Sequence, residues 1–483
     1  MRNDLPLPGG GTFPRDRDLV LGRILEYGLL ALIIFSPLPV GSVNEWSLLA
    51  IELTVVMMAA ACLLLGERPS LHPDLEGGMR WPRYAFIGLI LFVALQSLPL
   101  PGGLVKLVSP GVWDFRRRFA PGVGKTYWMS LSLAPGETLR TGLEIVTFIL
   151  LGWLIIRTVT RRHHIRRILV VLTALGSFEA LYGLYELTTK TPRILFYKKI
   201  FSPGAATGTF VNGSHYAGYL EMIIPLTIGL VLARVDFFAL GGQGLRDKLV
   251  SIGTRRLVEN VALTLAVVVM SVAVLLSRSR AGLSVLVVVF LILLEGVTLH
   301  FSRIRVRRLW LRNFLLVTFG LTTAAALYVG VGATVRRFAL DNLLQDNRPV
   351  FWAGTVRMIA DHPWTGTGLG TFALVYPAYE LSGAPQLFLA HAHNDYLEYL
   401  AELGAVGFCL LVGGVLYLAA RAFLAWRVRR DPQVKALGLG LLASLAGIMI
   451  HSLTDFNLHI PANTLLFVIV LGLAIVTAFD RKR

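Results

Sequence analysis

Twelve long apolar runs constrain the fold of this 483-residue chain more than any other feature. A run of about 17 to 22 residues with few charges has the length that an α-helix needs to cross a lipid bilayer. Only 16% of the residues are charged, 55% are hydrophobic, and the mean hydropathy is +0.66. The sequence therefore predicts an all-α polytopic membrane protein with about twelve transmembrane helices. We place the spans at 24–40, 46–65, 84–100, 139–156, 168–187, 216–233, 260–276, 282–299, 314–333, 396–420, 437–454 and 463–479.

The basic residues indicate which side of the membrane each connecting segment occupies. With both chain ends inside, 30 of the 46 Lys and Arg residues fall in inner segments and 16 in outer segments, counting with the latter Arg140 at the outer end of its span. This division follows the positive-inside rule. The clusters Arg161-Arg162, Arg255-Arg256 and 303–308 are accordingly expected to be inner anchors. Because the charges are spread over many loops rather than one face, the net charge of +17 predicts contact with membrane lipids and not with nucleic acid.

Other features of the sequence exclude several classes of chemistry. Residues 1–23 are predicted to be a cytoplasmic N-terminal segment without a removable signal peptide, and residues 24–483 to form one transmembrane domain. Cys62 and Cys409 both lie in predicted spans, so we expect no disulfide and no thiolate metal site. The chain has no Walker loop or dinucleotide fingerprint, which argues against ATP hydrolysis and predicts no cofactor.

Three predicted outer segments are long: 101–138, 188–215 and 334–395. In the third, apolar residues at helical spacing predict an amphipathic helix over 349–361 at the outer membrane interface, and Pro363 ends it. The glycines that follow are Gly366, Gly368 and Gly370. A glycine-rich loop can cradle phosphate, but this one follows a helix and lacks the P-loop lysine, so a tight turn that re-enters the bundle is favoured.

Arginines occur at the predicted outer surface, where the positive-inside rule does not place them. Arg278 and Arg280 lie in a short turn between two spans, and Arg348 and Arg357 lie on the predicted helix of the long outer segment. One interpretation is that these side chains extend along the helices to lipid phosphates. The other is an anion-binding site, because guanidinium groups make bidentate hydrogen bonds to phosphate and stay charged.

Histidines and other polar residues accumulate at the same predicted ends of the spans. Single interfacial histidines are usually anchors, whereas several such clusters at one membrane face favour a reacting site that opens to water. The clusters are His391-Ala-His-Asn-Asp395, then Asn212, Ser214, His215 and Tyr216 with Glu221 deeper in the span, and finally His451, Asp455, Asn457 and His459.

Four stretches in a fixed order give the chain a family resemblance. They are "GTFVNGSHYAGYLEMIIPL", "SRSRAGL", "RPVFWAGTVRMIADHPWTGTGLGTF" and "HAHNDYLEYLAELGAVGF". Together they resemble the bacterial O-antigen ligase family, which includes O-antigen and exopolysaccharide polymerases, over roughly residues 140–480. The resemblance implies a GT-C-like membrane glycosyltransferase that uses an undecaprenyl-pyrophosphate-linked glycan without a metal.

The resemblance also implies roles for particular residues. His393 corresponds to the family's histidine before a long helix and is the candidate general base. Arg280 and Arg348 correspond to arginines that stabilise the departing pyrophosphate, with Arg278 competing with Arg280 and His391 with His393. Asn394 or Asp395 would orient the imidazole. The candidate substrate-binding residues are Arg278, His391, Asn394, Asp395, Asn212, His215 and Arg357.

The function predicted from these features is transfer of the lipid-linked glycan to lipid A core at the periplasmic face of the inner membrane, with inversion at the anomeric carbon. The stretch "HSLTDFNLHIPAN" is associated equally with polymerases. A polymerase that joins lipid-linked repeat units therefore remains an alternative, as does, in another class, a flippase for lipid-linked oligosaccharides. The sugars, their linkage, the acceptor and the oligomeric state stay open.

Overall fold

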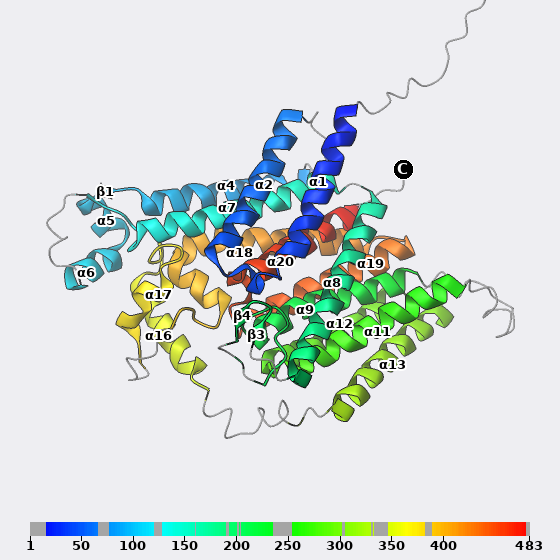
Figure 1. Ribbon diagram of the computed structural model, residues 1–483. Coiled ribbons are helices and arrows are strands. Elements are labelled where there is room, and N and C mark those ends of the chain that lie inside the picture. Colours follow the sequence, from blue (N-terminus) through cyan, green and yellow to red (C-terminus); the bar gives the residue numbers. More distant parts are fainter. Residues whose placement is uncertain are drawn as a thin grey trace, which may run out of the picture.

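The computed structural model describes an almost entirely helical chain (Figure 1). It describes residues 16–65, 77–119, 128–159, 161–189, 193–199, 202, 204–234, 254–301, 305–329, 332, 346–381 and 389–479. In these residues the strands are confined to two short antiparallel pairs, β1 (Leu100–Pro101) with β2 (Trp128–Met129) and β3 (Arg193–Ile194) with β4 (Tyr197–Lys198). The prediction of an all-α polytopic membrane protein is confirmed.

Long helices correspond to the predicted spans. In chain order they are α1 (Asp16–Phe35), α2 (Glu45–Leu65), α4 (Arg80–Ser97), α7 (Pro135–Thr158), α8 (Arg162–Thr189), α9 (Gly213–Ala233), α11 (Thr254–Leu276), α12 (Arg280–His300), α13 (Arg305–Val329), α18 (Asp395–Arg427), α19 (Pro432–His451) and α20 (Pro461–Phe479). Nine of those described are long and apolar enough to cross a membrane, and α1, α4 and α13 correspond to the other predicted spans.

The helix ends extend beyond the apolar runs. The helix α13 begins at Arg305 rather than at 314, and α18 continues to Arg427 rather than ending at 420. Backbone hydrogen bonding continues a helix into water after the hydrophobic stretch has ended, and local signals then set its bounds. In α19 those signals are Pro432 in the first turn and Asp431, whose carboxylate accepts hydrogen bonds from two backbone N–H groups.

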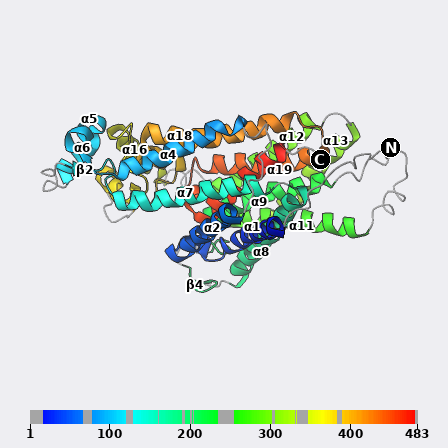
Figure 2. The ribbon, with the colours of Figure 1, turned by 90° about the horizontal axis from the view of Figure 1, so that it is seen from above.

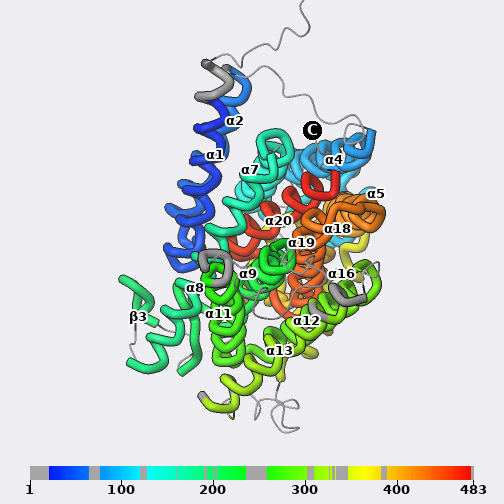
Figure 3. The backbone as a smooth tube through the Cα atoms, turned by 90° about the vertical axis from the view of Figure 1, so that its right-hand side faces the viewer, coloured from blue at the N-terminus to red at the C-terminus, as the bar shows by residue number. Residues whose placement is uncertain are grey.

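The centre of the bundle is α9, which is buried along its whole apolar length. It packs against α8, α11, α12, α19 and α20, and α19 and α20 are themselves mostly buried (Figure 3). A helix that is surrounded by protein does not have to present apolar side chains to lipid. Polar residues such as Glu221 can therefore lie within α9, provided that they find partners there.

The shorter elements gather mainly at one end of the long helices (Figure 2). They are η1 (Val40–Ser42), α5 (Gly102–Val108), α6 (Pro110–Phe119), α16 (Arg348–Asp361), α17 (Phe372–Val375), η4 (Tyr376–Tyr379) and η5 (Asn457–His459). Hydrogen bonds there join two of the long segments that are predicted to be outside, from the Leu133 N–H to the Thr367 carbonyl over 2.8 Å and between the Ser109 and Thr365 hydroxyls over 2.8 Å.

The helix predicted within residues 334–395 is α16, and the turn after it enters the bundle as expected. Gly366, Gly368 and Gly370 have φ values of 65°, 109° and 75°, a region that favours glycine. The N–H groups of Gly370 and Phe372 donate to the Glu402 carboxylate of α18 over 2.9 and 2.8 Å. The turn therefore holds a carboxylate of its own chain where a phosphate cradle would hold its ligand.

Cysteine labelling is expected to reproduce the predicted topology. Gly77 and Gly136 are exposed, and a Cβ at either position meets nothing within 4 Å. In a background without Cys62 and Cys409, an impermeant thiol reagent should label Gly136→Cys but not Gly77→Cys in intact spheroplasts, because only residue 136 is predicted to be outside. Labelling of Gly77→Cys alone would reverse the topology. Residues 302–304, 334–345 and 382–388 lie outside the described residues, as do the side chains of 305–308.

Candidate functional site

The polar clusters predicted at the outer ends of the spans come together in the structure, and helix caps position them. Asn212 caps α9 by accepting from the Ser214 N–H over 2.9 Å, and Ser279 caps α12 by accepting from the Gly282 N–H over 3.0 Å. Asn394 caps α18 by accepting from the Leu397 N–H over 3.1 Å. Two predicted substrate-binding residues, Asn212 and Asn394, are therefore engaged in local helix capping.

Asp455, in the turn between α19 and α20, is the centre of the cluster. It is fully buried, and its Oδ1 lies 3.2 Å from His393 Nδ1 and 3.8 Å from His215 Nε2. Its Oδ2 lies 3.4 Å from a terminal nitrogen of Arg348. One carboxylate thus contacts residues from the beginnings of α9 and α16 and from the segment just before α18. The sequence placed Asp455 in a polar turn but did not select it as a site residue.

Asp455 is ionised at neutral pH. Burial alone would raise the pKa of this carboxyl group, but contacts with His215 and His393 and the charge of Arg348 outweigh burial and lower the pKa well below its usual range. A carboxyl group with a depressed pKa stabilises the fold above its unfolded-state pKa, and the contribution is lost as the pH falls through the folded-state pKa. Because the ionised carboxylate can only accept, His393 Nδ1–H donates the hydrogen bond between them.

His393 has an unusual backbone conformation and a partly exposed side chain. Its φ is 52°, a left-handed value that is uncommon for residues other than glycine, and its side chain is 27% exposed. Its ring lies 4.9 Å from that of Phe456 and 6.5 Å from that of Phe351. The prediction that Asn394 or Asp395 orients this imidazole is wrong, because Asp455 is its partner.

Asn394 and Asp395 have other partners because the turn between α19 and α20 packs against the beginning of α18. The Asn394 side-chain amide donates to the Leu453 carbonyl over 2.8 Å. Asp395 is buried, and its carboxylate accepts from the Leu458 N–H over 3.1 Å and from His459 Nδ1–H over 2.7 Å. Both side chains fix this turn in place, and the turn presents Asp455 to His393.

The arginines predicted to bind anions fall into three different surroundings. Arg280 forms an ion pair with Asp346, whose other oxygen accepts from the Arg348 N–H over 3.1 Å. Arg280 and Arg348 are therefore neighbours, with side chains 17% and 23% exposed. The guanidinium group of Arg278 instead lies beside Gly204. Arg357 is exposed nine residues further along α16, about 13 Å by helical rise from Arg348.

A second group of titratable side chains adjoins the first. His391 Nδ1 lies 2.8 Å from Glu398 Oε1, and His459 Nε2 lies 3.4 Å from the same oxygen. In the described part of the chain, this trio offers ligand atoms within 4.8 Å of one another, a spacing that could hold a metal ion. Burial lowers the pKa of His459, but Glu398, Asp395 and Glu402 together raise it to about 10. These carboxylates therefore favour the protonated form of His459, and a metal ion bound there would have to displace its proton.

Phe456, which sequence reasoning did not single out, packs among three histidines of the site. Its ring centroid lies 4.4 Å from that of His215, 4.2 Å from that of His391 and 4.9 Å from that of His393. An aromatic residue next to a buried carboxylate excludes water from one side of the cluster and limits the rotation of each imidazole. No sequence pattern marks such a residue before the fold is known.

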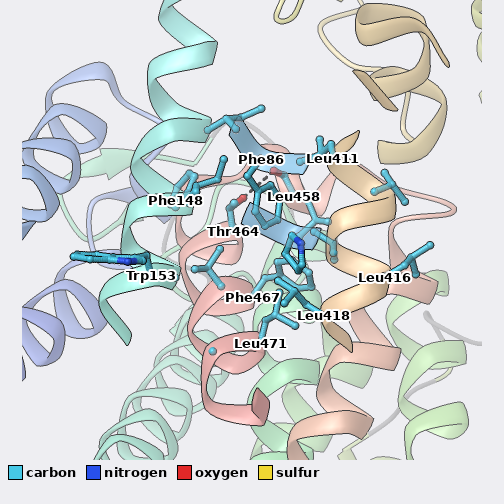
Figure 4. A pocket seen from close by; sticks show the side chains of 18 of the residues that line it. Phe86, Phe148, Trp153, Leu411, Leu416, Leu418, Leu458, Thr464, Phe467 and Leu471 are labelled. Atoms are coloured by element: carbon cyan, nitrogen blue, oxygen red, sulfur yellow. Dashed lines mark hydrogen bonds between the residues drawn. The ribbon is translucent and has the colours of Figure 1, made fainter. Parts of the chain in front are cut away.

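An apolar cavity of about 300 Å³ lies beside the site, between α4, α7, α18 and α20 (Figure 4). Its walls include Phe86, Phe148, Leu411 and Phe467, and Asp395 and Tyr399 lie among its lining residues. Because Asp395 also bonds to His459, the cavity adjoins the polar cluster. The arrangement suits a ligand with one apolar chain and one charged end.

The fold and the cluster define a class: a multi-pass helical membrane protein with a site of histidines, arginines and a buried carboxylate at one end of its bundle. Residues 265–412 match the family model described as O-Antigen ligase. The chain is 32% identical over 114 residues to the O-antigen ligase of Pseudomonas aeruginosa strain PAO1, an alignment that covers 24% of this chain and 25% of that protein. These matches confirm the resemblance to the O-antigen ligase family, which is carried by residues 265–412.

The matched segment includes Arg278, Arg280, Arg348, His391 and His393. Asp455 and His459 lie beyond its end, and His215 precedes it. The aligned part spans only a quarter of the length of the curated relative.

Proposed function

We propose that this protein is a membrane glycosyltransferase that transfers a glycan from undecaprenyl pyrophosphate to lipid A core at the periplasmic face of the inner membrane. The observation that carries the proposal is the position of Asp455, which contacts both the candidate base His393 and the candidate pyrophosphate-binding Arg348. An imidazole and a guanidinium group held by one buried carboxylate supply the two functions that glycosyl transfer from a pyrophosphate needs.

His393 is the general base in this mechanism. Its Nδ1–H donates to Asp455, so Nε2 of the neutral imidazole carries the lone pair that accepts the proton of the acceptor hydroxyl. The acceptor oxygen forms a bond to the anomeric carbon as the bond from that carbon to the phosphate oxygen breaks. The electron pair of the broken bond leaves with the pyrophosphate, and attack from the opposite face inverts the anomeric centre.

Arg280 and Arg348 stabilise the leaving group. The negative charge on the pyrophosphate grows in the transition state, and fixed cations stabilise that charge without reorganisation. In each arginine the ion pair with Asp346 or Asp455 involves one terminal nitrogen of a group that has five N–H donors. The remaining donors can contact phosphate oxygens, and the acids keep both guanidinium groups in position before the donor binds.

The apolar cavity supports a lipid-linked donor. It offers about 300 Å³ between four spans next to the polar cluster, enough for part of an isoprenoid chain whose pyrophosphate reaches the arginines. His391 and His459 are joined through Glu398 and hold the first turn of α18 in position. In this mechanism the charges of the protein's own side chains stabilise the leaving pyrophosphate.

The surface polysaccharide of a deletion strain tests the proposal and separates ligase from polymerase. Loss of a ligase should leave full-length polymer on the undecaprenyl carrier and none on lipid A core, because only the last transfer is blocked. Single repeat units on lipid A core would instead indicate a polymerase. Unaltered polymer on lipid A core would contradict both activities. Immunoblots of lipopolysaccharide and of extracted carrier lipids, with a complemented strain as control, give the result.

A further inference from the structure

A second cavity, of about 420 Å³, lies at the other end of the bundle and contains three arginines. Arg162 and Arg166 come from the first turns of α8, and Arg234 follows the end of α9. Arg234 is nineteen residues from His215, about 28 Å along α9, so the cavity is separate from the candidate active site. Its other walls include the beginnings of α11 and α19 and the ends of α9 and α20.

The charges around this cavity leave Arg234 without a complete set of partners. Glu259 Oε2 lies 3.0 Å from a terminal nitrogen of Arg234 and 3.9 Å from one of Arg166, so a single carboxylate serves two guanidinium groups. Within the part of the chain that the structure describes, the buried Nε of Arg234 has no hydrogen-bond partner. Burial, followed by the nearby Arg166, lowers the pKa of Arg234. An anion in the cavity would satisfy this donor and relieve the repulsion between the two arginines.

Apolar side chains complete the cavity beside the charges. Leu230 and Ala233 of α9 and Leu437 of α19 line it, and Leu230 and Leu437 lie within helices that are apolar enough to cross the membrane. A soluble anion would leave these surfaces in contact with water. A ligand that matches both the arginines and the apolar side chains has a phosphate group attached to hydrocarbon. Such a ligand approaches from the plane of the membrane.

We propose that this cavity binds the phosphodiester headgroup of an anionic phospholipid, with the phosphate between Arg166 and Arg234 and the first carbons of an acyl chain against Leu230 and Leu437. The α8 N-terminus, whose dipole favours negative charge, adds to the attraction. By the predicted topology the site faces the cytoplasmic leaflet. It is independent of the transfer reaction and would anchor the inner ends of α8, α9 and α19 to the membrane.

Binding of short-chain lipids to the purified full chain in an uncharged detergent tests this proposal. Dioctanoyl-phosphatidylglycerol should bind the wild type and dioctanoyl-phosphatidylcholine much more weakly, as measured by native mass spectrometry. Arg166→Gln, at a side chain 59% exposed, should weaken phosphatidylglycerol binding about tenfold, because one charge-assisted contact is lost. Arg234→Gln should do the same, whereas Arg161→Gln, an exposed arginine outside the cavity lining, should bind like the wild type.

Three outcomes would overturn the proposal. Equal binding of phosphatidylglycerol by the wild type and by Arg166→Gln would show that the lipid does not bind in this cavity, even if Arg234→Gln failed to fold. If phosphatidylcholine bound as tightly as phosphatidylglycerol, the site would not recognise the negative charge of the lipid. Displacement of the lipid by an equal concentration of inorganic phosphate would identify a soluble anion as the ligand. Size-exclusion profiles of each variant show whether the fold is kept.

Discussion

His393→Gln is expected to lower the rate of glycan transfer by about two to four orders of magnitude, because glutamine keeps the polarity of the side chain but cannot accept the proton of the acceptor hydroxyl. Donor binding should change little, since the arginines and the apolar cavity remain. The measurement is the single-turnover transfer rate of the purified protein as a function of pH. In the wild type the rate should fall in acid, where a base that must be neutral becomes protonated.

The acidic decline of the wild type should report His393 and not Asp455. The pKa of Asp455 is held well below its usual range, so this carboxylate stays ionised throughout the interval in which a histidine titrates. His391→Gln is the matched control, and we expect a smaller loss because His391 Nδ1 bonds to Glu398 and not to Asp455. Near wild-type transfer by His393→Gln, or an unchanged acidic decline in this variant, would exclude His393 as the base.

Arg280→Ala and Arg348→Ala are each expected to reduce transfer by about 30-fold to nearly 1,000-fold. Each removes a charge-assisted contact to the departing pyrophosphate, which raises the barrier by roughly 2–4 kcal/mol. Lysine at either position should restore only part of the rate, because it keeps the charge but loses the bidentate geometry. Transfer rates at saturating donor, measured with protein that elutes as the wild type does, give the comparison.

An arginine elsewhere at the same end of the bundle provides the control for these two. Arg140, at the beginning of α7, is exposed and pairs with Glu45 and Glu137, so Arg140→Ala should transfer at the wild-type rate. If Arg280→Ala and Arg348→Ala also kept that rate, neither arginine would bind the pyrophosphate. Full restoration of the rate by Arg348→Lys would indicate that the residue mainly compensates the charge of Asp455, because lysine keeps the charge without the bidentate geometry.

The spans could be predicted from the sequence because hydropathy is a local property of the chain. The end and the direction of a helix depend less on the local sequence. The helix α18 extends to Arg427, about 50 Å in all, and it changes direction at Gly404, which has a φ of 59°. The backbone of the turn containing Gly366 packs against Gly404 at this point. No periodicity within either segment reveals that contact.

The sequence predicted residues that belong to the candidate site, but it did not predict which of them contact one another. Histidines and arginines at the ends of apolar runs stand out because they are rare there, and the family resemblance then singled out His393, Arg280 and Arg348 among them. Their partners depend on packing between segments far apart in the sequence. Asp455 is 62 residues from His393, and Asp346 is 66 residues from Arg280. The sequence offered the adjacent Asn394 or Asp395 as the partner of His393, yet Asn394 bonds to Leu453 and Asp395 to His459.

The most direct measurement of the central claim uses the same single-turnover assay with the purified chain in proteoliposomes, a labelled undecaprenyl-pyrophosphate-linked glycan and lipid A core. The label should appear on lipid A core in amounts that match the undecaprenyl pyrophosphate released, with no nucleotide added. His393→Gln, under the same conditions, should release almost none. Movement of intact donor across the bilayer without any transfer to lipid A core would contradict the account and identify a transporter.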